Sequence, residues 1–248
     1  MNGNVFKKTL PRLRWQELNK LVPPRPSFEM AMLPNNVAYV KINSMADGDK
    51  SDEIFAQNFT ENSKADALIL DLRENGGGSS GVGYKILSFL IDTPFKQSKW
   101  FTREYHPTFR AWGRPDKTFG DENAFEYNLE AVKKMRGANT QPFLKPIVVL
   151  SSPRTFSAAE DFLVAFKPLK RGLIIGEPTG GSTGQPLIIS LPGGGLARIC
   201  SKHDTFPDGT KFVGVGVIPD ILAKPKISDF VENKDSVLEI ALQELKKK

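Results

Sequence analysis

Thr155-Phe-Ser157-Ala-Ala-Glu160, preceded by the apolar run Pro146-Ile-Val-Val-Leu-Ser151, is the stretch that decides the fold of this 248-residue chain. The apolar run predicts a buried strand, and the Ser-Pro-Arg break after it predicts that the chain then enters a helix. Ser157 would stand at the N-terminus of that helix, where unpaired amides and the helix dipole stabilise developing negative charge. A structural explanation also exists, because serine is a common N-cap and Glu160 would close a capping box with Ser157.

Two further turns fit the same picture. Asp71-Leu-Arg-Glu-Asn-Gly-Gly-Gly78 follows the apolar run 67–71, and Gly176-Glu-Pro-Thr-Gly-Gly-Ser-Thr-Gly184 follows the run 172–176. A glycine-rich turn at the end of a neighbouring strand supplies main-chain amides for an oxyanion hole. Helix capping requires one serine and does not require three such turns, so the set favours a catalytic interpretation.

The rest of the chain predicts an α/β domain over residues 36–248, preceded by an irregular segment 1–35 with one short helix at 13–21. Strands are expected at 36–43, 67–72, 146–151, 172–176, 186–191, 195–201 and 211–217, and helices at 51–62, 81–91 and 235–247. Alternation of this kind favours a sheet with helices on its faces. Residues 93–145 interrupt it with an aromatic-rich insertion, which we interpret either as a substrate-facing lid or as a self-packed surface subdomain.

The ordered motifs Asp-Leu-Arg-x-Asn-Gly-Gly-Gly, Thr-x-Ser-Ala-x-Glu, Gly-Glu-Pro-Thr-Gly-Gly and Gly-Val-Gly-Val-Ile-Pro-Asp resemble those of the S41 serine peptidases over roughly residues 36–222. These are the tail-specific or C-terminal processing proteases, with the tricorn core as a relative. The resemblance implies a core like that of the Clp proteases and crotonases, and a reaction through an acyl-enzyme. It implies no cofactor and no metal, protein substrates with extended or unstructured segments, and a periplasmic or other extracytoplasmic location.

The same resemblance implies roles for individual residues. Ser157 would be the nucleophile, and the amide of Ala158 with that of Gly77 or Gly76 would form the oxyanion hole. Glu160 would support the base or the helix start. The loop residues Gly181 and Ser182 would contact substrate.

The general base is the open question. Processing proteases of the family carry a lysine where this chain has Ser182, and serine cannot remove a proton from another serine near neutral pH. The tricorn-like branch uses a histidine before the core, but residues 1–105 contain none, and its glutamate position holds Val213. The alternatives are His203, Lys202 or His106 within the chain, a histidine in an upstream segment, or a pseudo-enzyme that keeps the fold and binds without cleaving.

The composition excludes several other classes. A formal charge of +6 with scattered basic residues is not typical of a nucleic-acid-binding protein. No apolar run reaches the length of a membrane span, and the first residues lack the apolar core of a signal peptide. The lone Cys200 excludes an internal disulfide and is expected to be a buried, inert thiol. The oligomeric state is left open.

Three other functions are alternatives to a peptidase. Gly176–Thr183 has the spacing of a phosphate-binding loop, but serine replaces the lysine and a strand follows instead of a helix. A crotonase-type enzyme acting on acyl thioesters lacks a suitable acidic pair near the glycine turns. A binding module for a peptide or lipophilic ligand, with a cleft lined by residues 100–125, remains as the main alternative.

Overall fold

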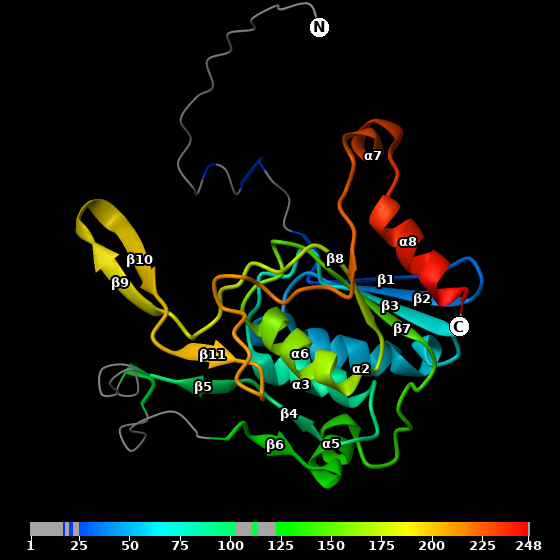
Figure 1. Ribbon diagram of the computed structural model, residues 1–248, viewed down its shortest axis with the longest axis horizontal. Coiled ribbons are helices and arrows are strands. Elements are labelled where there is room, and N and C mark those ends of the chain that lie inside the picture. The colour runs from blue at the N-terminus through cyan, green and yellow to red at the C-terminus, as the bar shows by residue number, and fades with distance from the viewer. Residues whose placement is uncertain (1–16, 18–19, 22–24, 103–110, 114–122, 248) are drawn as a thin grey trace, which may run out of the picture.

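A computed structural model describes residue 17 and residues 20–21, 25–102, 111–113 and 123–247 of the chain (Figure 1). Most of the helix expected at 13–21, and His106, lie outside these residues. The described helices are η1 (Asp47–Asp49), α2 (Ser51–Asn62), α3 (Ser80–Ser88), α5 (Leu129–Arg136), α6 (Ala158–Phe166), η2 (Lys167–Leu169), η3 (Pro192–Gly194), α7 (Ile227–Glu232) and α8 (Ser236–Leu245).

The strands build one main sheet and three small ones. The main sheet has the order β1 (Phe28–Leu33), β2 (Val37–Ile42), β3 (Ala67–Asp71), β7 (Ile147–Ser151), β8 (Leu173–Gly176) and β12 (Ile221–Leu222). The small sheets pair β4 (Phe95–Lys96) with β6 (Glu126–Tyr127), β5 (Lys99–Phe101) with β11 (His203–Thr205), and β9 (Leu187–Leu191) with β10 (Gly195–Ile199). All neighbours in the main sheet run parallel except β1, which is antiparallel to β2.

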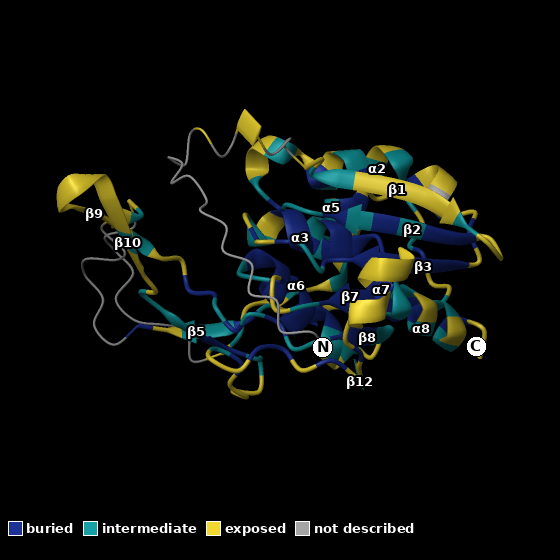
Figure 2. Ribbon diagram, turned by 90° about the horizontal axis from the view of Figure 1, so that it is seen from above, coloured by how far each residue is buried: buried dark blue, intermediate teal, exposed yellow. Residues whose placement is uncertain are grey.

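The two faces of the main sheet bury two separate apolar layers. Leu68 and Leu70 of β3 point to one face and pack with α2, α3 and α6, whereas Ile69 points to the other and packs with α8 (Figure 1). Side chains alternate along a strand, so a central strand covered on both faces must be apolar throughout. Every residue of β3 and β7 is buried accordingly, and Figure 2 shows the same central strands in dark blue. The predicted α/β sheet with helices on its faces is therefore confirmed.

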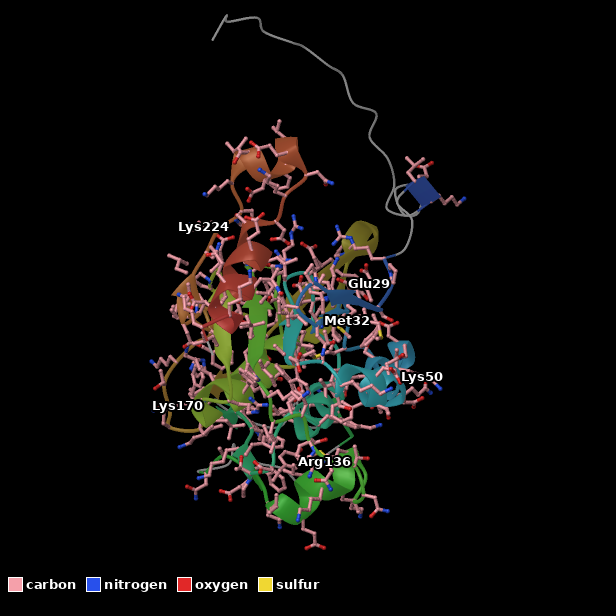
Figure 3. The ribbon with its side chains drawn as sticks, turned by 90° about the vertical axis from the view of Figure 1, so that its right-hand side faces the viewer. Glu29, Met32, Lys50, Arg136, Lys170 and Lys224 are labelled. Atoms are coloured by element: carbon pink, nitrogen blue, oxygen red, sulfur yellow. The ribbon has the colours of Figure 1, made fainter. Side chains whose placement is uncertain are left out.

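Two predictions about elements were wrong. The segment 1–35 was expected to be irregular, but Phe28–Leu33 forms β1 and extends the sheet by one edge strand. Glu29 and Met32 of β1 lie at the periphery of the molecule (Figure 3), and four of its six residues are exposed, so it has no alternating apolar pattern to read. The strand expected at 211–217 is a series of turns, because Gly214 and Gly216 have φ values of 84° and 90°.

The Cys200 thiol is exposed instead of buried. It follows the β9–β10 hairpin, which projects from the body of the molecule (Figure 1) and is largely exposed (Figure 2). A β-like pattern of apolar residues therefore did not indicate burial here.

The region 93–145 partly packs on itself and partly faces the centre of the molecule. Phe95 and Tyr127 stack with ring centroids 4.7 Å apart, and Tyr84 of α3 packs against both. These rings attach β4 and β6 to α3. Trp100 of β5 lies elsewhere in the same region and lines the cavity described below.

Candidate active site

The three glycine- and serine-containing turns meet at the carboxyl ends of β3, β7 and β8. The amide of Phe156 donates to the carbonyl of Asn75 over 2.9 Å, and the amide of Gly180 donates to the carbonyl of Thr155 over 3.0 Å. In open α/β sheets this edge is the usual position of a ligand site. The sequence motifs are thus brought together by direct backbone hydrogen bonds.

Ser157 has an unusual backbone conformation at the corner between β7 and α6. It is the N-cap of α6 with φ 52° and ψ −122°, close to the first central position of a type II′ turn, where glycine is favoured. A non-glycine residue held at positive φ stores strain, and such residues gather at active sites. A similar combination of a strained turn and a helix start presents the nucleophile in α/β-hydrolases.

Gly77 lies directly against Ser157. A methyl group on Gly77 would come within 2.7 Å of Ser157 Cβ and 3.0 Å of the Ala158 nitrogen. The amide of Gly77, however, donates to Asn75 Oδ1 over 2.8 Å, so this donor is already engaged. Within the described residues, the amides of Ala158, Gly76 and Gly78 meet no hydrogen-bond acceptor, and Gly78 lines the cavity described below whereas Gly76 does not. Gly76 is exposed and has open space around its Cα.

Glu160 holds the helix start and the neighbouring loop together. Its side chain is fully buried and accepts four hydrogen bonds. The donors are Thr179 Oγ1 (2.6 Å) and the amides of Gly181 (2.7 Å), Ser182 (3.0 Å) and Ser157 (3.1 Å). Burial raises the pKa of the Glu160 carboxyl, and the four hydrogen bonds act in the opposite direction. The geometry thus ties Glu160 to the helix start and not to a base.

The loop residues Gly181 and Ser182 have their amides turned toward Glu160. Gly181 is buried, and a methyl group there would come within 2.7 Å of the Gly216 nitrogen. The carbonyl of Ser182 accepts a hydrogen bond from the Ser157 amide over 3.1 Å. The position that carries lysine in processing proteases is therefore adjacent to the nucleophile turn, but its serine side chain supplies no basic group.

Lys202 and His203 point in different directions because they are consecutive residues at the start of a strand. Lys202 Nζ donates to Asp204 Oδ1 over 2.8 Å and lies 5.4 Å from the centroid of the Trp100 ring. His203 instead packs against Phe101, with ring centroids 5.0 Å apart. No side-chain nitrogen or carboxylate of the described residues hydrogen-bonds to Ser157 Oγ, so neither residue is in place as a base.

Ser157 opens onto a cavity of about 620 Å³. Its lining includes Gly78, Ser80, Tyr84, Trp100, Asp161 and Lys202. Gly181, Ser182 and His203 do not belong to it. The aromatic-rich region therefore does contribute a wall to the site, as one of the two interpretations of residues 93–145 expected.

Asp161 is the cavity residue that the sequence reasoning missed. It lies one helical turn after Ser157, and its carboxylate accepts hydrogen bonds from Ser80 Oγ (2.6 Å) and Thr183 Oγ1 (3.3 Å). Burial, with a smaller contribution from the negative charge of Asp204, raises the pKa of Asp161 to about 6. Residues i and i+4 share a helix face, and this spacing from Ser157 was the available signal.

The described residues form neither a metal site nor a membrane-spanning helix. They contain no group of three or more His, Cys, Asp or Glu side chains able to hold a metal ion. None of the helices in the described part of the chain combines the length and the apolar character needed to cross a membrane.

Comparisons with known proteins show the family to which the chain is similar. The model of peptidase family S41 matches residues 36–223. The chloroplastic C-terminal processing peptidase of Tetradesmus obliquus is 30% identical over 174 residues, which are 69% of this chain and 32% of that protein. The carboxyl-terminal-processing protease of Synechocystis is 25% identical over 88% of this chain and 45% of its own length. The chain thus spans less than half the length of the curated relatives named here.

A solved structure shows the same fold. A Parabacteroides merdae protein, described as a candidate peptidase, superimposes with a TM-score of 0.70 at 20% identity, covering 90% of this chain and 65% of that one. At this identity the likeness concerns the fold alone.

Proposed function

The chain belongs to peptidase family S41, and on that premise we propose that it is a serine-type peptidase in which Ser157 cleaves peptide bonds through an acyl-enzyme. One observation carries the proposal. Ser157 is held at positive φ and lines the same cavity as Gly78, and the amides of Gly78 and of the adjacent Ala158 meet no acceptor in the described residues. Helix capping alone does not require either feature.

The reaction would follow the usual order for acyl transfer. Ser157 Oγ attacks the carbonyl carbon of the substrate, a base takes the serine proton, and the carbonyl oxygen becomes an oxyanion. We assign the two oxyanion donors to the amides of Ala158 and Gly78, because the Gly77 amide is held by Asn75 and Gly76 does not line the cavity. The proton then passes to the leaving amine, and water releases the acyl group from Ser157 in a second attack. Losing one oxyanion donor typically lowers turnover about 10²- to 10³-fold.

The position of the general base limits the rate of peptide hydrolysis that we expect. Lys202 shares the cavity with Ser157, but its ammonium group is hydrogen-bonded to Asp204. His203 packs against Phe101 on the other side of β11. Nucleophile and base act as a unit in such enzymes, so a poorly placed base costs most of the rate. We therefore expect this chain by itself to hydrolyse peptides weakly.

The substrate we propose is an extended or unstructured protein segment. Extended peptides bind by adding a strand to a sheet edge, which uses main-chain hydrogen bonds and demands little from side chains. The relatives named above are processing peptidases, which supports a protein substrate. An extracytoplasmic location is part of the same proposal.

A catalytically inactive binding module is the second candidate. The absence of a base beside Ser157 Oγ in the described residues favours it, as does the partly aromatic cavity of about 620 Å³. Such a cavity is in the size range of sites for small molecules or peptide side chains.

Labelling by a fluorophosphonate separates the two candidates. An activated serine reacts with this probe, so we expect a covalent adduct on Ser157 that mass spectrometry of the digested protein locates. Ser157→Ala should abolish the adduct. The matched control is Ser152→Ala, which removes a hydroxyl that donates to the carbonyl of Arg73 in the same turn and should leave labelling intact. An unlabelled wild-type protein would contradict the peptidase proposal and favour the binding module.

A further inference from the structure

Among the described residues, the charged groups around the cavity beside Ser157 include more carboxylates than cations. Asp161 lines the cavity and is only 6% exposed. Asp204 does not line the cavity, but its Oδ1 accepts hydrogen bonds from the cavity residues Lys202 and Ser98. Lys202 is thus one ammonium facing two buried carboxylates. A buried carboxylate without a cation of its own is costly, and a ligand that brings the cation removes that cost.

Hydrogen bonding shows the same shortage of donors. Asp204 is fully buried, and its second oxygen, Oδ2, has no hydrogen-bond partner among the described residues. In the described part of the chain, the side-chain donors to Asp161 are the neutral hydroxyls of Ser80 and Thr183. Charged donors form hydrogen bonds to carboxylates that are roughly twice as strong as those from neutral ones. The described residues therefore leave acceptor capacity in the site unfilled.

The walls suit the same kind of ligand. Tyr84, Trp100, Phe125 and Tyr127 line the cavity, and Trp100 already lies 5.4 Å from the Lys202 ammonium, within the range of cation–π attraction. Aromatic faces bind the methylene stem and the charged head of a long basic side chain together. A short or acidic side chain would leave the rings uncovered or meet the two carboxylates.

We propose that this cavity is a specificity pocket that receives a lysine or arginine side chain of the substrate, with Asp161 as the residue that selects the positive charge. The inference rests on the proposed function, because Ser157 lines the pocket and attacks the carbonyl of the residue whose side chain would enter it. The peptidase would then cleave after a basic residue.

A small cation tests the pocket without any turnover. In the Ser157→Ala protein, benzamidinium should bind at least about 10-fold more tightly than neutral benzamide, the gain expected for one charge-assisted contact. Adding Asp161→Asn should remove that preference, whereas Asp66→Asn, which alters an exposed carboxylate just before β3 and outside the cavity, should keep it. Titration calorimetry measures all six affinities. Equal binding of the two probes would overturn the proposal, and tighter binding of benzoate would assign the pocket to an anion through Lys202.

The pH dependence gives a second measurement on a protein with an unchanged Asp161. The pKa of Asp161 is raised to about 6, with Asp204 and Lys202 as its charged neighbours and Tyr84 facing it from α3. Benzamidinium affinity should therefore rise between pH 5 and pH 7 as the carboxylate ionises. A flat profile would contradict the role of Asp161 even if Asp161→Asn failed to fold.

Substrate pairs connect the pocket to cleavage. Peptides that differ only in lysine or norleucine before the cleaved bond should differ about 10-fold or more in kcat/KM, and Asp161→Asn should bring that ratio close to one. Labelled Ser157 with no lysine preference would refute the pocket and leave the peptidase in place. Benzamidinium binding that depends on Asp161, without labelling of Ser157, would refute the peptidase and leave a cation site.

Discussion

Two charge clusters lie near the carboxyl ends of the main-sheet strands, and both set two carboxylates against one cation. On the α8 side, Arg73 pairs with Asp71 and Asp235. On the α6 side, Lys202 pairs with Asp204 and faces Asp161. The charge count is the same, but the pKa of Asp235 is lowered by Arg73 against the effect of burial, whereas that of Asp161 is raised by burial.

The shape of the cation explains the difference. Arg73 donates Nε and Nη2 to Asp71 and both terminal nitrogens to Asp235, with distances of 2.7 to 3.1 Å. The planar guanidinium fork thereby satisfies both carboxylates. Lys202 makes one hydrogen bond to a carboxylate and leaves Asp204 Oδ2 without a donor among the described residues. We call the first cluster closed, because Arg73 satisfies both of its carboxylates, and the second open, because Asp204 Oδ2 lacks a donor among the described residues.

The largest expected effect comes from breaking the closed cluster. Arg73→Met removes the fork and leaves Asp71, which is 1% exposed, without a cation, so we expect a loss of about 3–5 kcal/mol in the free energy of unfolding. Arg73→Lys keeps the charge but loses the planar geometry, so its free energy of unfolding should lie between those of wild type and Arg73→Met. Urea denaturation at pH 7 measures both. A loss below about 1 kcal/mol for Arg73→Met would mean that the cluster does not hold the fold.

A smaller effect of the opposite sign is expected in the open cluster, where replacing Asp161 should become more stabilising as the pH rises. Because the folded-state pKa of Asp161 is raised to about 6 from an ordinary value near 4, its contribution to stability is full below about pH 4 and is lost as the pH rises through 6. Two pKa units correspond to about 3 kcal/mol. The free energy of unfolding of Asp161→Asn, relative to wild type, should therefore increase by up to that amount between pH 4 and pH 7. If the difference in the free energy of unfolding stayed constant with pH, the charge of Asp161 would be compensated in the fold to the same degree as that of Asp71.

Asp235→Asn should give the smallest change. The side chain of Asp235 is 37% exposed, caps α8 through the amide of Leu238 and pairs with Arg73. Asparagine retains the cap, so only the fork partner is lost, and we expect about 1 kcal/mol of destabilisation. The pKa of Asp235 is lowered in the fold, so the wild-type advantage should disappear as the pH falls below its ordinary pKa near 4. Chemical denaturation at pH 3 and pH 7 checks this.

The parts of the fold with a strong pattern were predictable from the sequence. The helix expected at 51–62 and the strand expected at 67–72 match α2 and β3 closely, because each has the apolar spacing of its element. β1 was missed because an exposed edge strand needs only backbone pairing with β2. The prediction of a strand at 211–217 was wrong because turns at Gly214 and Gly216 override the β propensity of the residues around them.

The site shows the same limit. The sequence indicated that Ser157, Glu160 and the glycine turn lie together, since the carboxyl ends of parallel strands share an edge. It could not show that the amide of Gly77, among three consecutive glycines, is the one already engaged, because that depends on the Asn75 side chain. Nor could it show that Lys202 faces the cavity while His203 faces Phe101, or that Asp161 is buried opposite Asp204. These facts depend on the approach of β11, which is distant in sequence.

The backbone at Ser157 also limits which amino acids can occupy that position. With φ at 52° and ψ at −122°, a β-branched or bulky residue there would strain the turn, whereas glycine would relax it. A library randomised at this codon and sorted only for folded protein should be enriched in glycine and depleted in valine and isoleucine. Serine would then be maintained there by selection on chemistry, against the preference of the main chain.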